Sequence, residues 1–148
     1  MIDHVWTVYC SNTVIDRETN NVSIFNIIEE LAIKDAPKPD GVIGLPTELV
    51  TLWVRSEPEE PAVGLSRMSF LSPSGESLIS LEYEIDLKKS ERLRYRIHLQ
   101  QIPLRESGRH KFLIELKTNE DQDWQRVSSI PFIVKFQPAE VEKDVEEA

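Results

Sequence analysis

The chain has 148 residues, of which 40% are hydrophobic and 29% are charged. This composition is that of one globular domain, and it excludes a collagen-like, a wholly disordered or a helical membrane-spanning chain. The formal net charge of −9 argues against a general nucleic-acid binder and against a protein that binds membranes through basic residues.

The charge is distributed unevenly along the chain. Residues 1–87 contain 5 basic and 15 acidic residues, residues 88–136 contain 11 basic and 6 acidic residues, and residues 137–148 contain 1 basic and 5 acidic residues. The second segment is therefore a basic region attached to an acidic body. We expect a single domain over residues 1–136, followed by an acidic, disordered tail over residues 137–148.

The single cysteine, Cys10, has no partner in the chain for a disulfide, and residues 1–6 resemble no secretion signal. Both features predict a cytoplasmic protein. Cys10 lies in an apolar segment without a nearby histidine or basic residue that would activate its thiol, so we expect it to pack in a protein core.

In chain order, the first predicted elements form a hairpin. Two apolar runs, residues 5–15 and 22–33, flank the polar turn at residues 16–21. Part of the second run, residues 24–31, also fits the apolar stripe of a helix, but we favour a strand. Residues 34–46 contain three Pro and two Gly, and this composition predicts a loop.

The remaining predicted strands are recognised mainly by apolar residues at every second position. They cover residues 50–54, 63–71, 78–85, 92–99, 111–117 and 124–136. Pro73 and Gly75 mark a turn between two of these strands. Pro131 interrupts the last one, which places that strand at a sheet edge or at a bulge.

Eight short strands separated by turns, with no long amphipathic helix, are typical of an all-β fold. The sequence therefore predicts an antiparallel β-sandwich of two sheets, with a β-barrel as the alternative.

The order of these elements resembles that of a known family. The segments that carry the resemblance are the hairpin from Tyr9-Cys10 to Ile24-Phe25, the Pro-rich segment after it, the turn Ser72–Glu76 and the strand entry Ser107–Phe112. Over Val5 to Phe136 the chain resembles a family of short uncharacterised bacterial proteins built as single Ig-like or C2-like sandwiches. The resemblance implies a fold and carries no activity, because that family has none assigned.

Sequence motifs for catalysis are lacking. The three histidines, His4, His98 and His110, show no metal-ligand spacing, and the chain has neither a glycine-rich phosphate loop nor a Gly-x-Ser-x-Gly elbow. We therefore expect a protein that is not an enzyme and needs no cofactor. A catalytic site assembled from distant residues stays open at this point, because such a site leaves no local motif.

A weak calcium motif occurs in the loop at residues 119–123. Asp121 and Asp123 stand at alternate positions, as at the start of a calcium-binding loop, but the glycine and the final glutamate of an EF-hand are missing. In a C2-like sandwich these two residues would need further ligands from other loops, for example Asp16, Glu59 or Glu60. Calcium or ligand binding by acidic loops at one end of the sandwich is the alternative function.

The most informative feature is a row of arginines. Arg92, Arg94 and Arg96 alternate with Leu93, Tyr95 and Ile97, so a strand would place all three arginines on one side. Neighbouring like charges repel, which requires acidic groups nearby, and Glu82, Glu84 and Glu115 on the preceding and following strands are the expected cross-strand partners.

The alternative role for the arginines is to bind an acidic partner. Basic residues on the following strand, Arg109 and Lys111, would extend such a surface. We therefore expect a non-enzymatic protein-interaction module that uses this basic strand face or its edge strands. Its partner would be another protein chain or a second copy of itself, including the acidic tail of that copy, and neither nucleic acid nor a membrane.

Overall fold

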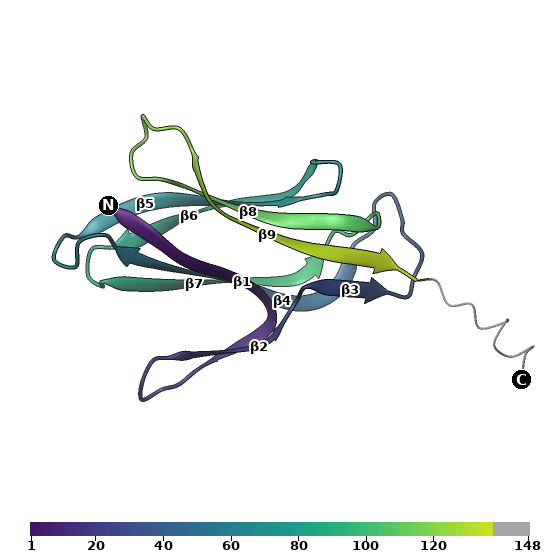
Figure 1. Ribbon diagram of the computed structural model, residues 1–148, viewed down its shortest axis with the longest axis horizontal. Coiled ribbons are helices and arrows are strands. Elements are labelled where there is room, and N and C mark those ends of the chain that lie inside the picture. The colour runs from purple at the N-terminus through teal and green to yellow at the C-terminus, as the bar shows by residue number, and fades with distance from the viewer. Residues whose placement is uncertain (138–148) are drawn as a thin grey trace, which may run out of the picture.

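The computed structural model describes residues 1–137 and folds them into nine β-strands (Figure 1). None of these residues forms a helix that is long and apolar enough to cross a membrane. The predicted acidic tail lies outside the described residues, except for Gln137. The strands are β1 (Ile2–Ile15), β2 (Val22–Ile27), β3 (Glu30–Ile33), β4 (Ile43–Arg55), β5 (Ala62–Leu71), β6 (Ser77–Leu87), β7 (Arg92–Ile102), β8 (Gly108–Lys117) and β9 (Gln125–Phe136).

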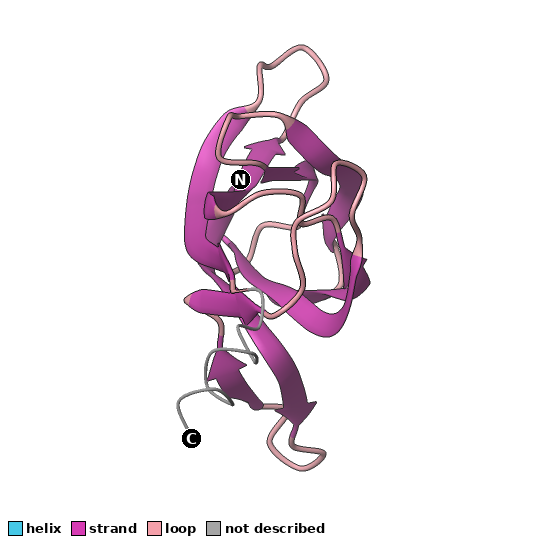
Figure 2. Ribbon diagram, turned by 90° about the vertical axis from the view of Figure 1, so that its right-hand side faces the viewer, coloured by secondary structure: helices cyan, strands magenta, loops and turns pink. Residues whose placement is uncertain are grey.

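The strands form two sheets that face each other, which confirms the predicted β-sandwich (Figure 2). The four-stranded sheet, here called sheet A, has the order β2-β1-β4-β7. The five-stranded sheet, sheet B, has the order β3-β9-β8-β5-β6. The sheets do not close into one barrel, so the alternative fold is wrong. All strand pairs are antiparallel except β3 and β9, which run parallel.

The number of strands differs from the prediction because the segment 22–33 divides between the two sheets. β2 pairs with β1 in sheet A, whereas β3 crosses over and pairs with β9 in sheet B. Asn26 has a left-handed backbone conformation with φ of 56°, which an extended strand does not allow. The chain therefore changes direction after Asn26, and Ile28 is buried where it passes between the sheets.

The β4 strand begins earlier than expected and includes part of the predicted loop at residues 34–46. Pro46 lies where the pairing of β4 with β7 is irregular, between Gly44 and Thr47. Because proline has no N–H to donate to a neighbouring strand, an irregularity at this point lets the sheet continue past it.

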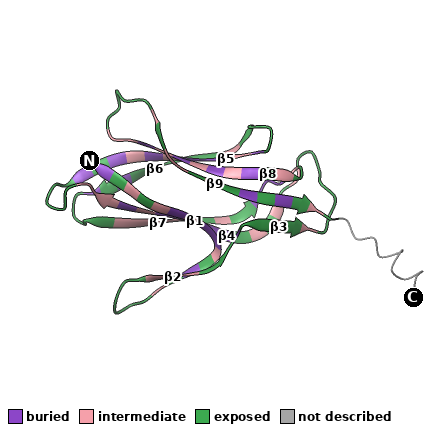
Figure 3. Cartoon of the chain, in the orientation of Figure 1, coloured by how far each residue is buried: buried purple, intermediate pink, exposed green. Residues whose placement is uncertain are grey.

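The core lies between the two sheets and is rich in aromatic side chains. Tyr9 and Trp53 of sheet A and Phe70, Phe112 and Phe132 of sheet B are at most 1% exposed. Figure 3 shows the buried segments concentrated in the strands of the sandwich, whereas the loops are exposed. Burial of large apolar side chains is the main favourable term in folding, so this cluster holds the two sheets together.

The ends of β1 and β2 leave the sandwich as a two-stranded arm, which comprises residues 11–27 and projects below sheet A in Figures 1 and 2. The arm contacts the outer face of sheet A through a hydrogen bond from Thr13 Oγ1 to Glu48 Oε2, 2.5 Å long. Cys10 and Val50 point to the outer face, yet both are 0% exposed. The arm therefore converts part of an outer sheet face into a second buried region.

Candidate functional site

Arg92, Arg94 and Arg96, here called the arginine row, lie side by side on the outer face of β7. Their partners in the register with β4 are Val54, Leu52 and Val50. Of the nine described strands, β7 is the last in sheet A and pairs only with β4, so its other side is a free edge of the described structure. The structure thus places the three arginines on one strand face, as the alternating pattern predicts.

The acidic partner of the row is Glu48 on β4. Arg96 Nη2 donates to Glu48 Oε1 at 3.0 Å, and His98 Nδ1 lies 3.3 Å from the same oxygen. The prediction that Glu82, Glu84 and Glu115 pair with the arginines from neighbouring strands is wrong, because β6 and β8 belong to sheet B.

The other two arginines have no carboxylate nearby among residues 1–137. Arg94 donates to the backbone carbonyl of Asn20 in the turn of the arm, from Nη1 at 3.2 Å and from Nη2 at 3.0 Å. Arg92 is exposed. Within residues 1–137, no acidic side chain lies within 4.0 Å of the guanidinium nitrogens of Arg92 or Arg94. Two positive charges at this edge are therefore not neutralised by the described part of the chain.

The charges of the row affect one another. Partial burial lowers the pKa of Arg94, and the neighbouring charges of Arg92 and Arg96 lower it further. Burial alone would raise the pKa of Glu48, but hydrogen bonds from Thr13 and Arg96, with the charges of Arg96 and His98, lower it overall. Glu48 is therefore ionised at neutral pH, and it offsets the charge at one end of the row.

Cys10 is fully buried beside Glu48, which confirms its predicted burial. Burial raises the pKa of the Cys10 thiol, and the charge of Glu48 raises it further. The thiol form is the weaker nucleophile, so this environment favours packing over chemistry.

Arg109 and Lys111 lie apart from the arginine row, because they are on β8 in sheet B. Their side chains alternate with buried His110 and Phe112, which places them on the outer face of that sheet. Arg109 lines a pocket of about 370 Å³ together with Glu29 and other residues near β9. The structure therefore does not bring the five predicted partner-binding residues onto one surface.

A second charged row lies on β6, and the sequence did not predict it as a binding feature. Glu82, Glu84 and Asp86, here called the acidic row, lie on the outer face of β6, opposite Arg67, Leu65 and Val63 of β5. β6 is the last strand of sheet B, so it also has a free edge. The alternation of apolar and acidic residues from Leu81 to Leu87 indicates that the acidic side chains share one face, but it does not indicate which sheet the strand joins.

The acidic loop between β8 and β9 contains Asp121 and Asp123, and both are exposed. The backbone N–H of Asp121 donates to the side chain of Asn119 in the same loop. In the described part of the chain, no group of three or more His, Cys, Asp or Glu side chains is arranged to hold a metal ion. The calcium hypothesis therefore has no ligand cluster to support it.

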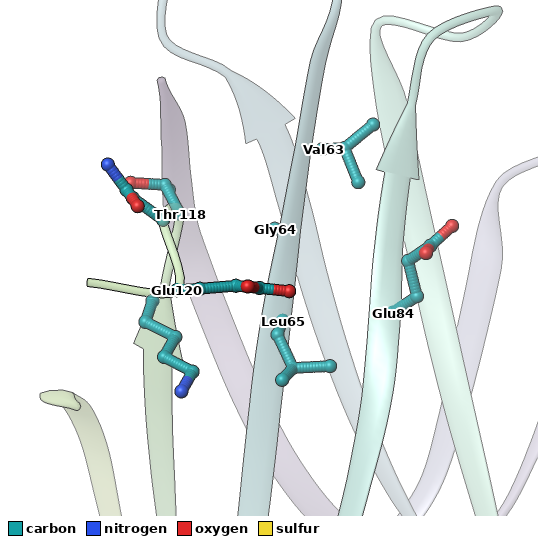
Figure 4. A pocket seen from close by; sticks show the side chains of 8 residues that line it. Val63, Gly64, Leu65, Glu84, Thr118 and Glu120 are labelled. Atoms are coloured by element: carbon teal, nitrogen blue, oxygen red, sulfur yellow. The ribbon is translucent and has the colours of Figure 1, made fainter. Parts of the chain in front are cut away.

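A shallow pocket of about 230 Å³ lies beside the end of β8 (Figure 4). Its lining includes Gly64 of β5, Glu84 of β6 and Lys117 of β8. Pockets that enclose small molecules usually have about 300 to 1,000 Å³, and this one offers no histidine or cysteine for catalysis. It is therefore a weaker candidate than the free strand edges.

Comparisons with known proteins identify no family. No family model matches the chain, and no curated protein sequence matches it. Among solved structures, it is similar to the Pseudomonas fluorescens alkylpurine DNA glycosylase AlkC bound to DNA containing an abasic site analog, with 9% sequence identity and a TM-score of 0.37. The match covers 87% of this chain and 30% of the glycosylase, and a likeness this distant carries no argument about function.

Proposed function

We propose that this protein is a non-enzymatic interaction module that binds an extended, acidic segment of a protein at the free edge of β7. The observation that carries the proposal is the arginine row beside an unpaired strand edge. Among the described residues, the backbone groups on that edge have no neighbouring strand to bond with, and such an edge is a template for a further strand.

The two faces of β7 define the partner that fits. A strand that pairs with β7 points its side chains alternately to the outer face and to the core side. On the outer face they would meet Arg92 and Arg94, which lack carboxylate partners among residues 1–137. On the core side they would meet Leu93, Tyr95 and Leu99, which are only partly buried. The best partner therefore alternates acidic and apolar residues.

Arginine is well suited to this role. Its planar guanidinium donates to carboxylates with two parallel hydrogen bonds, and such charge-assisted bonds are stronger than neutral ones. Arg94 is already oriented by the Asn20 carbonyl, which limits the side-chain entropy that binding would cost.

The proposal is tested with a fluorescent peptide that alternates Glu with Val, and with a matched peptide that has Lys in place of Glu. We expect the acidic peptide to bind and the basic peptide not to bind. The variant Arg92→Glu/Arg94→Glu should weaken binding at least tenfold, because both guanidinium groups are lost and replaced by like charges.

A matched control distinguishes a specific edge from general charge attraction. Arg109→Glu/Lys111→Glu changes the net charge by the same amount but alters the outer face of sheet B. Equal loss of binding in the two double variants would contradict the proposal, as would equal binding of the two peptides.

We further propose that the chain belongs with the uncharacterised bacterial proteins that have Ig-like or C2-like sandwiches. The support is the two-sheet architecture and the strand order along residues 5–136. Solving the structure of a member of that family tests this assignment, since a different strand order in that member would contradict it.

A further inference from the structure

We infer that the strand bound at the β7 edge is β6 of a second copy of this chain, so that two copies form a symmetric dimer. This inference rests on the proposed function, because it names the partner of the same strand edge. Its basis is that β6 and β7 are both free edges and carry opposite charge rows.

β6 has the pattern that the β7 edge selects. Its outer face carries the acidic row, Glu82, Glu84 and Asp86, and its core face carries Leu81, Tyr83, Ile85 and Leu87. Neither Glu82 nor Glu84 has an ion-pair partner within residues 1–137. Asp86 lies 3.9 Å from the Nζ atom of Lys88, just as Arg96 is paired with Glu48, so two residues of each row are left without an ion-pair partner in the described part of the chain.

Within one molecule the two rows are not able to pair. β6 and β7 lie on the same side of the sandwich, but they belong to facing sheets, which in sandwiches are about 10 Å apart. Tyr83 of β6 and Tyr95 of β7 stack across this gap, with ring centroids 4.0 Å apart. Both edges therefore remain unpaired along their backbones.

The tyrosine stack also sets the relative height of the two rows. Residues 88–91 form the short connection between β6 and β7, so the two strands run in opposite directions. Tyr83 and Tyr95 lie at the same height along the strands, and counting residues in both directions from them gives three further pairs at equal height, here called level pairs. These are Asp86 with Arg92, Glu84 with Arg94 and Glu82 with Arg96.

A two-fold axis parallel to the strands and outside this edge brings the rows together. The rotation moves β6 of the second copy into line with sheet A, beside β7, and moves β7 of the second copy beside β6. It preserves strand direction and height, so the new pairs are antiparallel and each acidic residue meets the arginine at its own level. Both contacts form at once, as a self-complementary interface requires.

Pairing of like edges is disfavoured by charge. Two β7 edges would set the arginine rows against each other, and two β6 edges would do the same with the acidic rows. Like charges directly opposite each other on paired strands are destabilising. The two rows therefore select the mixed pair over both alternatives.

The apolar side chains at this side of the sandwich support the same conclusion. Leu81 points to the core side of β6, yet it is 40% exposed, and Leu93, Tyr95 and Leu99 on β7 are only partly buried. Inward-facing residues on the central strands, such as Leu49 and Phe112, are fully buried. A second copy beside β6 and β7 would cover the apolar residues that the monomer leaves open.

The experiment measures the mass in solution by sedimentation at protein concentrations up to about 0.1 mM. We expect the parent chain to form a dimer. The variants Arg92→Glu/Arg94→Glu and Glu84→Arg/Asp86→Arg should each weaken dimerisation by about thirtyfold or more, because each creates two repulsive pairs at both symmetric contacts.

Mixing the two variants is the decisive measurement. In the mixed pair, one contact has the native charges and the other has them exchanged, so every level pair is attractive again and a heterodimer should form. Asp86 also accepts a hydrogen bond from the backbone N–H of Lys88, so the fold of each variant is checked by circular dichroism. Two folded variants that stay monomeric when mixed would overturn the inference.

A second test does not involve charge reversal. Leu81→Lys places a charge on the core side of the β6 edge and should abolish the dimer. The control Ile133→Lys alters a side chain of similar exposure, 43%, on the far strand β9 and should leave the dimer intact. Equal dimerisation of the Leu81→Lys variant and the parent would refute the proposed contact.

The two proposals fail in different ways. A parent chain that is monomeric at about 0.1 mM but binds the acidic peptide refutes the dimer and supports the interaction edge. A dimer that survives Arg92→Glu/Arg94→Glu refutes the dimer inference, because its interface lies elsewhere, and the interaction edge is then decided by peptide binding alone. If both proposals hold, the peptide and the second copy compete, and peptide affinity falls as the protein concentration rises.

Discussion

Replacement of Glu48 tests the network that joins the arm, β4 and β7. Its carboxylate accepts hydrogen bonds from Thr13 at 2.5 Å and from Arg96 at 3.0 Å, and its side chain is 8% exposed. Glu48→Ala would leave the Thr13 hydroxyl and the Arg96 guanidinium without their acceptor. We expect the free energy of unfolding to fall substantially.

The size of the loss follows from the exposure of the partners. Removing one member of a fully buried ion pair costs about 3 to 5 kcal/mol. The Arg96 side chain is 30% exposed and that of His98 is 55% exposed, so both regain some contact with water. We therefore expect about 3 kcal/mol for Glu48→Ala, which for a chain of this size corresponds to about 9 °C in Tm.

The assay is urea unfolding at one fixed, low protein concentration, because association would shift the midpoint. Glu48→Gln keeps an acceptor for Thr13 and should cost only about 1 kcal/mol. In a double-mutant cycle with Arg96→Gln, the two changes should be coupled by about 1 to 2 kcal/mol. A loss below about 0.5 kcal/mol for Glu48→Ala, or strict additivity in the cycle, would refute the network.

Three further predictions concern pH and backbone conformation. His110 is fully buried beside Phe70 and Phe132, and burial lowers its pKa, so the unfolded chain binds a proton more readily than the folded chain. Stability should therefore fall as the pH drops below about 6.5, and His110→Phe should flatten this dependence in urea midpoints between pH 5 and 7.5. Gly108 has φ of 130°, and a Cβ at this position would lie 2.9 Å from Pro73, so Gly108→Ala should lower the free energy of unfolding by about 2 kcal/mol. Gly75→Ala should cost less, because φ is 92° there but the space is open, and equal losses in thermal melts would contradict this prediction. Asn26→Gly should keep the Tm within about 2 °C, whereas Asn26→Val should lower it by several degrees, because a β-branched side chain disfavours a φ of 56° and glycine does not. A higher Tm for the valine variant than for the glycine variant would show that this backbone position is not strained.

The alternating pattern predicted local structure well. It gave the strand character of β6, β7 and β8 and the shared face of the arginine row, because side-chain direction in a strand depends only on position along the chain. The same pattern carries no information about which strand lies alongside. The connection at residues 88–91 is short enough for a hairpin, yet it joins strands in different sheets.

Glu48 shows where the prediction of the site failed. The expected loop ended at Pro46 and the expected strand began at Val50, so Glu48 was assigned to neither, and the acidic partner was sought on β6 and β8 instead. The available signal was a single acidic residue beside the apolar run from Leu49 to Val54, since a charge at the start of a buried strand needs a partner. The partner itself depends on the pairing of β4 with β7, which only the fold determines.

The two sides of the sandwich differ in the length of their free edges. β6 and β7 have 11 residues each, whereas β2 has 6 and β3 has 4, and the β2 edge belongs to the projecting arm. Continuous growth into a filament would require a long, accessible edge at both sides of every molecule. Residues 1–137 form such edges at one side only, so once that side is occupied, the described part of the molecule has no long edge left from which a filament could grow.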